Sequence, residues 1–85
     1  MEFRNIITFL KVAELKNFSK AAEKLGYSQS AVTVQIKQLE KELGIPLFEK
    51  NGRNTTLTRF GEEFLSCAEH TLSTLDEGIT TLHRN

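Results

Sequence analysis

Two capped helical runs separated by one residue are the feature that most constrains this chain. The first run covers residues 19–26 and the second covers residues 28–44, with Tyr27 between them. Each run begins with a serine, whose hydroxyl can accept a hydrogen bond from a free backbone N–H, and ends with a glycine, which can adopt the left-handed conformation that closes a helix. Two helices joined so tightly predict a helix-turn-helix, the motif whose second helix lies in the major groove of DNA.

The composition argues against several other classes of protein. The chain has 85 residues, enough for one small domain of marginal stability if burial acts alone. Its one cysteine, Cys67, precludes an internal disulfide, and no apolar run approaches the ~20 residues that span a bilayer. The first residues lack the charged and apolar regions of a signal peptide. We therefore expect a cytoplasmic protein that contacts no membrane.

The net charge of zero divides unevenly along the chain. Residues 1–61 carry ten Lys or Arg against six Asp or Glu, a net of +4, whereas residues 62–85 carry one against five, a net of −4. A basic N-terminal part and an acidic C-terminal part would orient one face of the molecule toward phosphate. The same division is equally compatible with ordinary solvated surface.

The periodicity of the second helix of the motif predicts how it is oriented. At about 100° per residue, its apolar residues fall on one side, which we expect to be buried: Val32, Ile36, Leu39 and Leu43. The opposite side carries hydroxyl, methyl-bearing and cationic groups: Ser30, Thr33, Val34, Lys37 and Lys41. That mixture suits base edges, thymine methyls and phosphates, and Gln29 at the helix start can pair bidentately with adenine. Any solvated helix has a polar face, but an exposed Val34 is less expected and favours contact with a thymine methyl.

The residues before the motif predict a first helix that ends near residues 16–17. Its apolar residues recur at helical spacing, as a main stripe with three residues that widen it. The stripe comprises Phe3, Ile6, Ile7, Leu10 and Ala13, and the widening residues are Phe9, Val12 and Leu15. In the following helix, Ala21 and Ala22 allow close helix approach, and Phe18 just before it is expected to staple the joint.

A short β-hairpin is predicted after Gly44. Pro46 prevents the helix from continuing, and apolar residues are expected to pack inward from two short strands: Leu47, Phe48 and Leu57. The dipeptide 51–52, Asn-Gly, favours a type I′ turn between them. Lys50 and Arg53 flank this tip, and an arginine there can enter a minor groove or contact its edge. The alternative is that the two cations only solubilise a loop.

The last helix, residues 58–85 with Thr58 as its N-cap, has two apolar sides. One is a heptad seam: Gly61, Leu65, Ala68, Leu72, Leu75, Ile79 and Leu82. The other is a neighbouring stripe: Phe60, Phe64 and Cys67. We expect the stripe to dock on the domain of residues 1–57 and the seam to pair with a second copy of the chain. The alternative is that both sides serve a single core.

An ordered set of residues along the whole chain resembles the N-terminal DNA-binding domain of LysR-type transcriptional regulators. Its members are Ala21, Ala22, Leu25, the run 28–32, Ile36, Leu39, Glu40, Leu43, Gly44, Leu47, Phe48, Arg53, Leu57, Thr58 and Gly61. Any one of these is weak evidence, but the set at these spacings is highly specific. The resemblance implies a mainly α winged helix-turn-helix, with three helices and a β-hairpin wing, followed by a long linker helix that pairs antiparallel with its twin.

The resemblance also implies which residues contact DNA and which pair two chains. The expected DNA-binding residues are Ser28, Gln29, Ser30, Thr33, Val34, Lys37, Lys50 and Arg53. The expected dimerisation residues are Leu65, Ala68, Leu72, Leu75, Ile79 and Leu82. The homodimer would bind an inverted repeat in double-stranded DNA. The family often has proline at position 30 and a polar or basic residue at position 34, so Ser30 and Val34 prevent transfer of a base preference.

Regulators of this family carry a larger C-terminal domain that binds a small-molecule inducer, and this chain stops before it. The chain is therefore either an excised fragment or a naturally short protein. The operator, the regulated genes, the sign of regulation and the inducer are not encoded in this stretch.

Two other classes of function were weighed against DNA binding. One is a protein-interaction module that keeps the winged fold and pairs with another regulator, which the balanced net charge favours slightly. The other is an enzyme, but His70 and His83 lack a cluster at metal-ligand spacing, and no phosphate loop or nucleophile motif is present. We therefore expect no enzyme activity, metal or cofactor, and we interpret Cys67 as a small packing residue.

Overall fold

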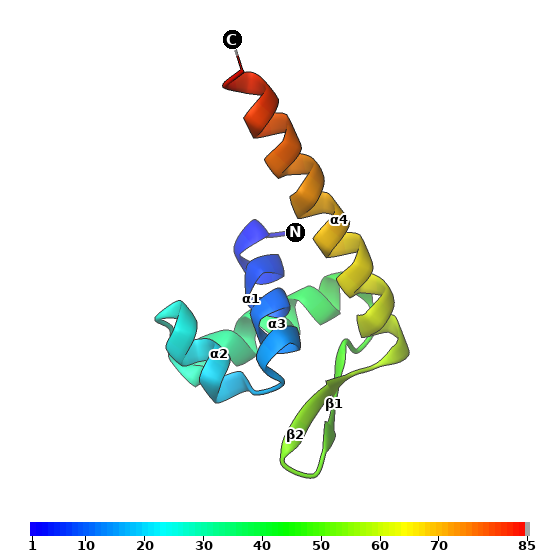
Figure 1. Ribbon diagram of the computed structural model, residues 1–85. Coiled ribbons are helices and arrows are strands. Elements are labelled where there is room, and N and C mark those ends of the chain that lie inside the picture. The colour runs from blue at the N-terminus through cyan, green and yellow to red at the C-terminus, as the bar shows by residue number, and fades with distance from the viewer. Residues whose placement is uncertain (85) are drawn as a thin grey trace.

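The computed structural model describes residues 1–84 and consists of four α-helices and a two-stranded antiparallel hairpin (Figure 1). In chain order the elements are α1 (Phe3–Leu15), α2 (Phe18–Leu25), α3 (Gln29–Leu43), β1 (Phe48–Asn51), β2 (Asn54–Leu57) and α4 (Arg59–Leu82). The first three helices pack together, and the hairpin and α4 lie on one side of this body and extend from it in opposite directions (Figure 1). This is the helical, winged architecture that the sequence predicts.

The core lies where α1, α2 and α3 meet the start of the hairpin. Its buried members are Phe9, Val12, Ala21, Ala22, Val32, Ile36, Leu39 and Leu47. A chain of aromatic contacts extends the core: the ring of Phe9 lies 5.3 Å from that of Phe48 and 5.1 Å from that of Phe64, centroid to centroid. Phe18 contacts Phe48 in turn, at 5.7 Å and nearly edge to face. These rings attach the hairpin and α4 to the three-helix body.

The buried face of α1 differs from the predicted apolar stripe. The stripe residues Ile6, Ile7, Leu10 and Ala13 are only half-buried and Phe3 is 52% exposed, whereas Phe9 and Val12 are fully buried together with two polar residues. Asn5 donates from Nδ2 to Gln38 Oε1 at 3.3 Å, and the Thr8 hydroxyl donates to Gln35 Oε1. Because these side chains satisfy one another across the α1–α3 contact, polar residues occupy positions that hydropathy assigns to the surface.

The helix ends follow the predicted capping residues, with one exception. Ser28 accepts a hydrogen bond from Ala31 N at 3.1 Å, and Thr58 accepts one from Gly61 N at 3.0 Å. Gly26 and Gly44 close their helices with φ of 76° and 74°. The expectation that Ser19 caps α2 is wrong: Asn17 Oδ1 accepts the bond from Lys20 N at 2.8 Å, and Phe18 is the first helical residue rather than the residue before the helix.

The earlier start of α2 has a physical reason. Asn17 has the extended backbone of an N-cap, with φ −160° and ψ 121°, and asparagine caps as well as serine. Starting there places Phe18 in the first turn, where its ring packs on Phe48. The hydroxyl of Ser19 is therefore not needed at the helix end.

The hairpin turn is placed one residue later than predicted. The register pairs Phe48 with Leu57 and Asn51 with Asn54, so the two-residue loop is Gly52-Arg53 rather than Asn51-Gly52. A type I′ turn needs positive φ at both central residues. Gly52 has φ +68°, but among residues 1–84 the only non-glycine residue with positive φ is Lys16. Positive φ at the first central residue alone, on a glycine, is the pattern of a type II′ turn, which puts Arg53 at the tip itself.

The first half of α4 packs on the body through residues that only partly match those predicted. The docking residues are Gly61, Phe64, Leu65 and Ala68, whereas Phe60 is 44% exposed and Cys67 is exposed. A Cβ at position 61 would clash with the carbonyl oxygen of Leu47, so glycine permits this close approach. The expected stripe therefore docks only through Phe64, and Leu65 and Ala68 of the expected seam face their own domain.

The second half of α4 extends beyond the other elements (Figure 1). Leu72 is half-buried, and Leu75, Ile79 and Leu82 are 49%, 44% and 80% exposed. The seam predicted from the sequence is thus divided between a half that its own domain covers and a half that is open.

Within the described part of the chain no helix is long and apolar enough to cross a membrane.

Candidate nucleic-acid interface

Every residue predicted to contact DNA is solvent-exposed. Helix α3 contributes Gln29, Ser30, Thr33, Val34 and Lys37, the residue before it is Ser28, and the hairpin contributes Lys50 and Arg53. Val34 is 56% exposed and the side chain of Lys37 is 76% exposed. The buried side of α3 is as predicted for Val32, Ile36 and Leu39, with Leu43 half-buried. The outer face of α3 is therefore free to contact another molecule.

A hollow of about 400 Å³ lies between α3, the start of α2 and the hairpin. Gln29, Thr33 and Lys37 line it from α3, and Lys50 and Arg53 line it from the hairpin. The tertiary structure thus brings together residues more than 20 positions apart in the sequence. Glu40 and Glu49 also line the hollow, so its three cations face two carboxylates.

A second hollow, of about 610 Å³, flanks the other side of α3. Ser28, Ser30 and Val34 line it together with Glu2 and Arg4 from the start of α1. Arg4 is exposed and adds a cation next to the first turn of α3. Sequence reasoning missed it, because no periodicity or motif connects residue 4 to residue 30; only the packing of α1 on α3 brings them together.

The rotation of α3 about its own axis is set by polar as well as apolar contacts. Its buried side includes Gln35, which accepts the hydrogen bond from Thr8, and Gln38 accepts one from Asn5, about one turn earlier on α1. If α3 were rotated about its axis, these groups would lie in the α1–α3 contact without hydrogen-bond partners. Leaving a buried polar group unpaired costs more free energy than losing a hydrogen bond whose partners can bind water instead. This arrangement keeps Thr33, Val34 and Lys37 on the outside.

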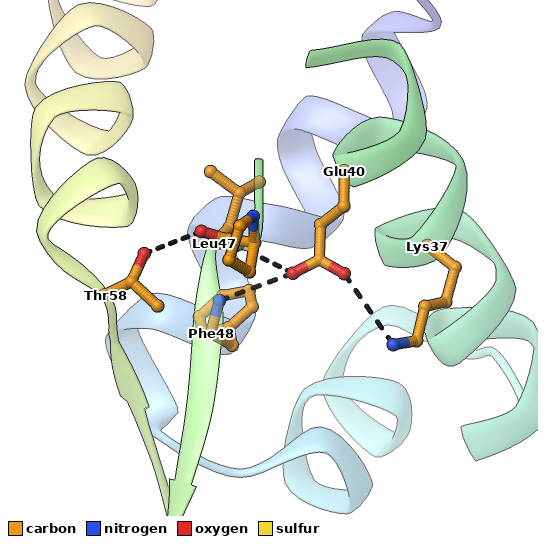
Figure 2. Close-up of polar contacts among 6 residues, drawn as sticks. Lys37, Glu40, Leu47, Phe48 and Thr58 are labelled. Atoms are coloured by element: carbon orange, nitrogen blue, oxygen red, sulfur yellow. Dashed lines mark hydrogen bonds and ion pairs between the residues drawn. The ribbon is translucent and has the colours of Figure 1, made fainter. Parts of the chain in front are cut away.

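One carboxylate connects α3 to the hairpin (Figure 2). Glu40 Oε2 accepts hydrogen bonds from the backbone N–H groups of Leu47 at 2.7 Å and Phe48 at 3.4 Å. Its other oxygen lies 3.9 Å from Lys37 Nζ, and the side chain of Glu40 is only 15% exposed. A largely buried carboxylate that satisfies backbone donors fixes the start of β1 relative to the recognition face.

The opposite side of the same backbone segment is held by α4. Thr58, the N-cap of α4, donates from Oγ1 to Pro46 O at 2.7 Å and from its backbone N–H to Leu47 O at 3.0 Å. Residues 46–48 are therefore bonded to α3 on one side and to the start of α4 on the other (Figure 2). In the sequence, Glu40 stood out only as part of a family pattern. Its contacts show that it connects α3 to the start of the hairpin.

The exposed side chains of the site are of types used in nucleic-acid recognition. It presents amide, hydroxyl, methyl and cationic groups, which are the groups that proteins use on base edges and phosphates. Among residues 1–84, no three His, Cys, Asp or Glu side chains lie close enough together to hold a metal ion.

A protein-family model described as "Bacterial regulatory helix-turn-helix protein, lysR family" matches residues 3–62. An uncharacterised HTH-type transcriptional regulator of Bacillus subtilis, YwqM, is 46% identical over 77 residues, which cover 91% of this chain and 26% of YwqM. The HTH-type transcriptional regulator CitR of the same organism is 44% identical over 84 residues, covering 99% of this chain and 29% of CitR. The chain thus spans between a quarter and a third of the length of these relatives.

Solved structures show the same fold. The BenM_DBD complex with benA site 1 DNA has a TM-score of 0.91 at 38% identity, covering 96% of this chain and 95% of that one. The CbnR_DBD–DNA complex has a TM-score of 0.88 at 37% identity, covering 95% and 93%. These neighbours are DNA-binding domains and the relatives are transcriptional regulators, so the expected family resemblance is confirmed. The chain belongs to the lysR family of bacterial regulatory helix-turn-helix proteins.

Proposed function

We propose that this chain binds double-stranded DNA sequence-specifically, as the DNA-binding part of a bacterial transcriptional regulator. Residues 1–57 would form the DNA-binding domain, with α3 in the major groove and the hairpin at the adjacent minor groove. The observation that carries this proposal is the hollow in which Gln29, Thr33 and Lys37 of α3 lie together with Lys50 and Arg53 of the hairpin. Polar side chains on the exposed face of α3 can contact base edges in a groove, and the cationic hairpin next to them can contact the phosphates along it.

The exposed groups divide into two roles. Lys37, Lys50 and Arg53 carry the charges that would neutralise phosphates, and Arg53 lies in the two-residue loop at the hairpin tip, beyond Lys50 in the strand register. Gln29, Thr33 and Val34 offer an amide, a hydroxyl and a methyl surface to base edges. Ser28 and Ser30 flank the first turn of α3, where hydroxyls and backbone N–H groups suit a phosphate.

We also propose that two copies pair through the open half of α4. Leu75, Ile79 and Leu82 recur at intervals of four and three and are exposed, and Leu72 precedes them on the same side. A helical segment that projects alone is marginal in water, so a second copy that covers these residues would stabilise it. Because Leu65 and Ala68 face their own domain, the proposed seam is restricted to residues 72–82.

A symmetric pair of chains would recognise symmetric DNA. The two α3 helices would lie in successive major grooves about 10 base pairs apart, so the site would be an inverted repeat. The curated relatives are three to four times longer than the matched stretch. We propose that the response to a small-molecule inducer lies in the additional part of such regulators, and that the whole protein acts in the bacterial cytoplasm, where its DNA is.

Salt dependence of binding tests the proposed function. A duplex selected by the chain from a random-sequence library would be titrated at 50 and 200 mM salt, as buffer conditions typical of such measurements. Neutralisation of several phosphates gives a loss of affinity of about 10³-fold or more over that interval. Failure to enrich any duplex, together with stable pairing with a different regulator, would favour the protein-interaction module instead.

A further inference from the structure

The hydroxyl of Ser19 is available for a contact across the turn of the motif. Asn17, not Ser19, caps α2, so Ser19 Oγ has no partner in its own helix end. It donates instead to Gln29 Oε1, the amide oxygen of the first residue of α3, at 2.6 Å. That distance is within the ordinary range for an O–H···O hydrogen bond. Ser19 therefore touches a residue that we assign to base recognition, although it lies on the other helix.

This contact determines which groups Gln29 presents. An amide oxygen has two acceptor positions and an amide nitrogen has two hydrogens. With one acceptor position of Oε1 occupied by Ser19, both hydrogens of Nε2 and the second acceptor position of Oε1 stay available. These are the groups that a glutamine uses when it pairs bidentately with an adenine. Ser19 and Gln29 both line the hollow between α3 and the hairpin, so the bond lies on the surface proposed to meet DNA.

Holding the amide in place has an energetic consequence. A free glutamine side chain on a helix samples many rotamers, and fixing it on a base costs conformational entropy. A hydrogen bond that already orients the amide in the free protein reduces that cost for the matching base only, because a mismatched base gains nothing from the preset orientation.

We propose that Ser19 is a positioning residue that sets the base preference of Gln29 at one position of the DNA site. The proposal rests on the proposed DNA binding and deepens it, because it assigns part of the sequence specificity to a side chain of α2. Ser19 acts through Gln29 and requires no contact of its own with a base.

The experiment first defines the position that Gln29 reads. The full chain and its Gln29→Ala variant each select from a random-sequence duplex library, and the position at which only the parent discriminates among bases is identified. Ser19→Ala, Ser19→Thr and the double variant Ser19→Ala/Gln29→Ala are then titrated against the selected duplex and its three single-base variants at that position.

The expected result is a specific loss of discrimination. Ser19→Ala reduces the preference for the selected base roughly threefold to tenfold, the range for one net hydrogen bond. Ser19→Thr, which keeps the hydroxyl, restores the preference to within about twofold of the parent. In the Gln29→Ala background, removing the hydroxyl has no further effect, because the group that it orients is absent.

Three results would overturn the proposal. In the first two, Ser19→Ala keeps the discrimination of the parent, or no position depends on Gln29; in both cases Ser19 does not position a base-reading amide. Alternatively, Ser19→Ala lowers affinity equally for all four bases, with or without Gln29, which is the behaviour of a direct phosphate contact. A parent that enriches no duplex overturns the proposed function itself, so that failure is distinct from these.

The variants are expected to fold. Ser19 is exposed and lies inside α2, where alanine is a better helix former than serine. Helix content and thermal unfolding of each variant check this before any titration.

Discussion

The two halves of α4 share one sequence pattern but have different surroundings. Apolar or small residues recur at intervals of four and three from Gly61 to Leu82. Gly61 and Ala68 are buried against the body, whereas Leu75 and Leu82 are exposed. Periodicity identifies an apolar face of a helix, but it does not say whether the same chain or another one covers that face. The contrast separates the molecule into a body that carries the proposed DNA-binding face and a projecting segment that we assign to pairing.

The largest expected effect is on assembly, from Leu75→Lys in the projecting segment. A lysine placed in the proposed seam would bury a charge unless its stem reaches water. The variant is expected to be monomeric and to lose about 100-fold or more in affinity for an inverted repeat, because simultaneous binding of two half-sites is lost. Sedimentation and titration measure the two effects, and any loss of helix content should be confined to the unpaired segment, residues 72–82.

The parent chain could instead sediment as a monomer at tens of micromolar and still bind an inverted repeat as one unit. That result would exclude residues 72–82 as the pairing surface. The matched control is Glu69→Lys, which adds the same side chain on an exposed position of α4 outside the apolar seam. It should leave the sedimentation coefficient unchanged.

The same substitution at two glycines of α4 should have opposite effects on stability. At Gly61, a Cβ would clash with the carbonyl oxygen of Leu47, which the backbone of Thr58 already holds at 3.0 Å. Gly61→Ala should lower the free energy of unfolding by ~2 kcal/mol, as overpacking does. At Gly78 nothing lies within 4 Å of the added Cβ, and alanine should stabilise the helix by up to about 1 kcal/mol. Denaturant unfolding measures both; equal signs would contradict the division of α4 into two halves.

In the body, Arg53→Ala should weaken DNA binding without changing assembly. Arg53 is exposed in the two-residue loop of the hairpin, and one charge-assisted contact contributes about 1 to 2 kcal/mol. The affinity for the selected duplex should fall about 5- to 30-fold, while sedimentation matches the parent. If the affinity is unchanged, the hairpin does not contact DNA and the cations there only solubilise the loop.

Lys37→Ala should mainly change the salt dependence. The side chain of Lys37 is 76% exposed, and its ion pair with Glu40, at 3.9 Å, is too exposed on the lysine side to contribute much to stability. Losing one phosphate contact should reduce the slope of log affinity against log salt by about 1 for each chain. An unchanged slope with an altered base preference would assign Lys37 to a base edge instead.

The smallest expected effect is that of Val34→Ala. Val34 is 56% exposed on the outer face of α3, where its methyl groups can contact a thymine methyl. Removing them should alter preference at one thymine-containing position and leave the salt slope as it is. Equal losses on all sequences would exclude base recognition by this residue.

The recognition helix was predictable because its signals are local. Ser28 at its start, Gly44 at its end and the apolar spacing of Val32, Ile36 and Leu39 act within a few residues of one another. The same locality explains why all expected DNA-binding residues are found exposed. The positions of Arg4, Ser19 and Glu40 in the tertiary structure were missed because each lies next to a segment that only packing brings near: the first turn of α3, the amide of Gln29 and the start of β1.

By itself, the sequence determined the number of helices, the caps of α3 and the N-cap of α4, and the polar face of α3, because hydrogen bonds at helix ends and side-chain periodicity depend on neighbours within one or two turns. Only the tertiary structure decided that Asn17 caps α2, that Arg53 occupies the hairpin tip, and that Leu65 and Ala68 pack on their own domain. In each case the local sequence allowed two arrangements. Contacts between distant segments, such as Phe18 with Phe48 and Gly61 with Leu47, selected between them.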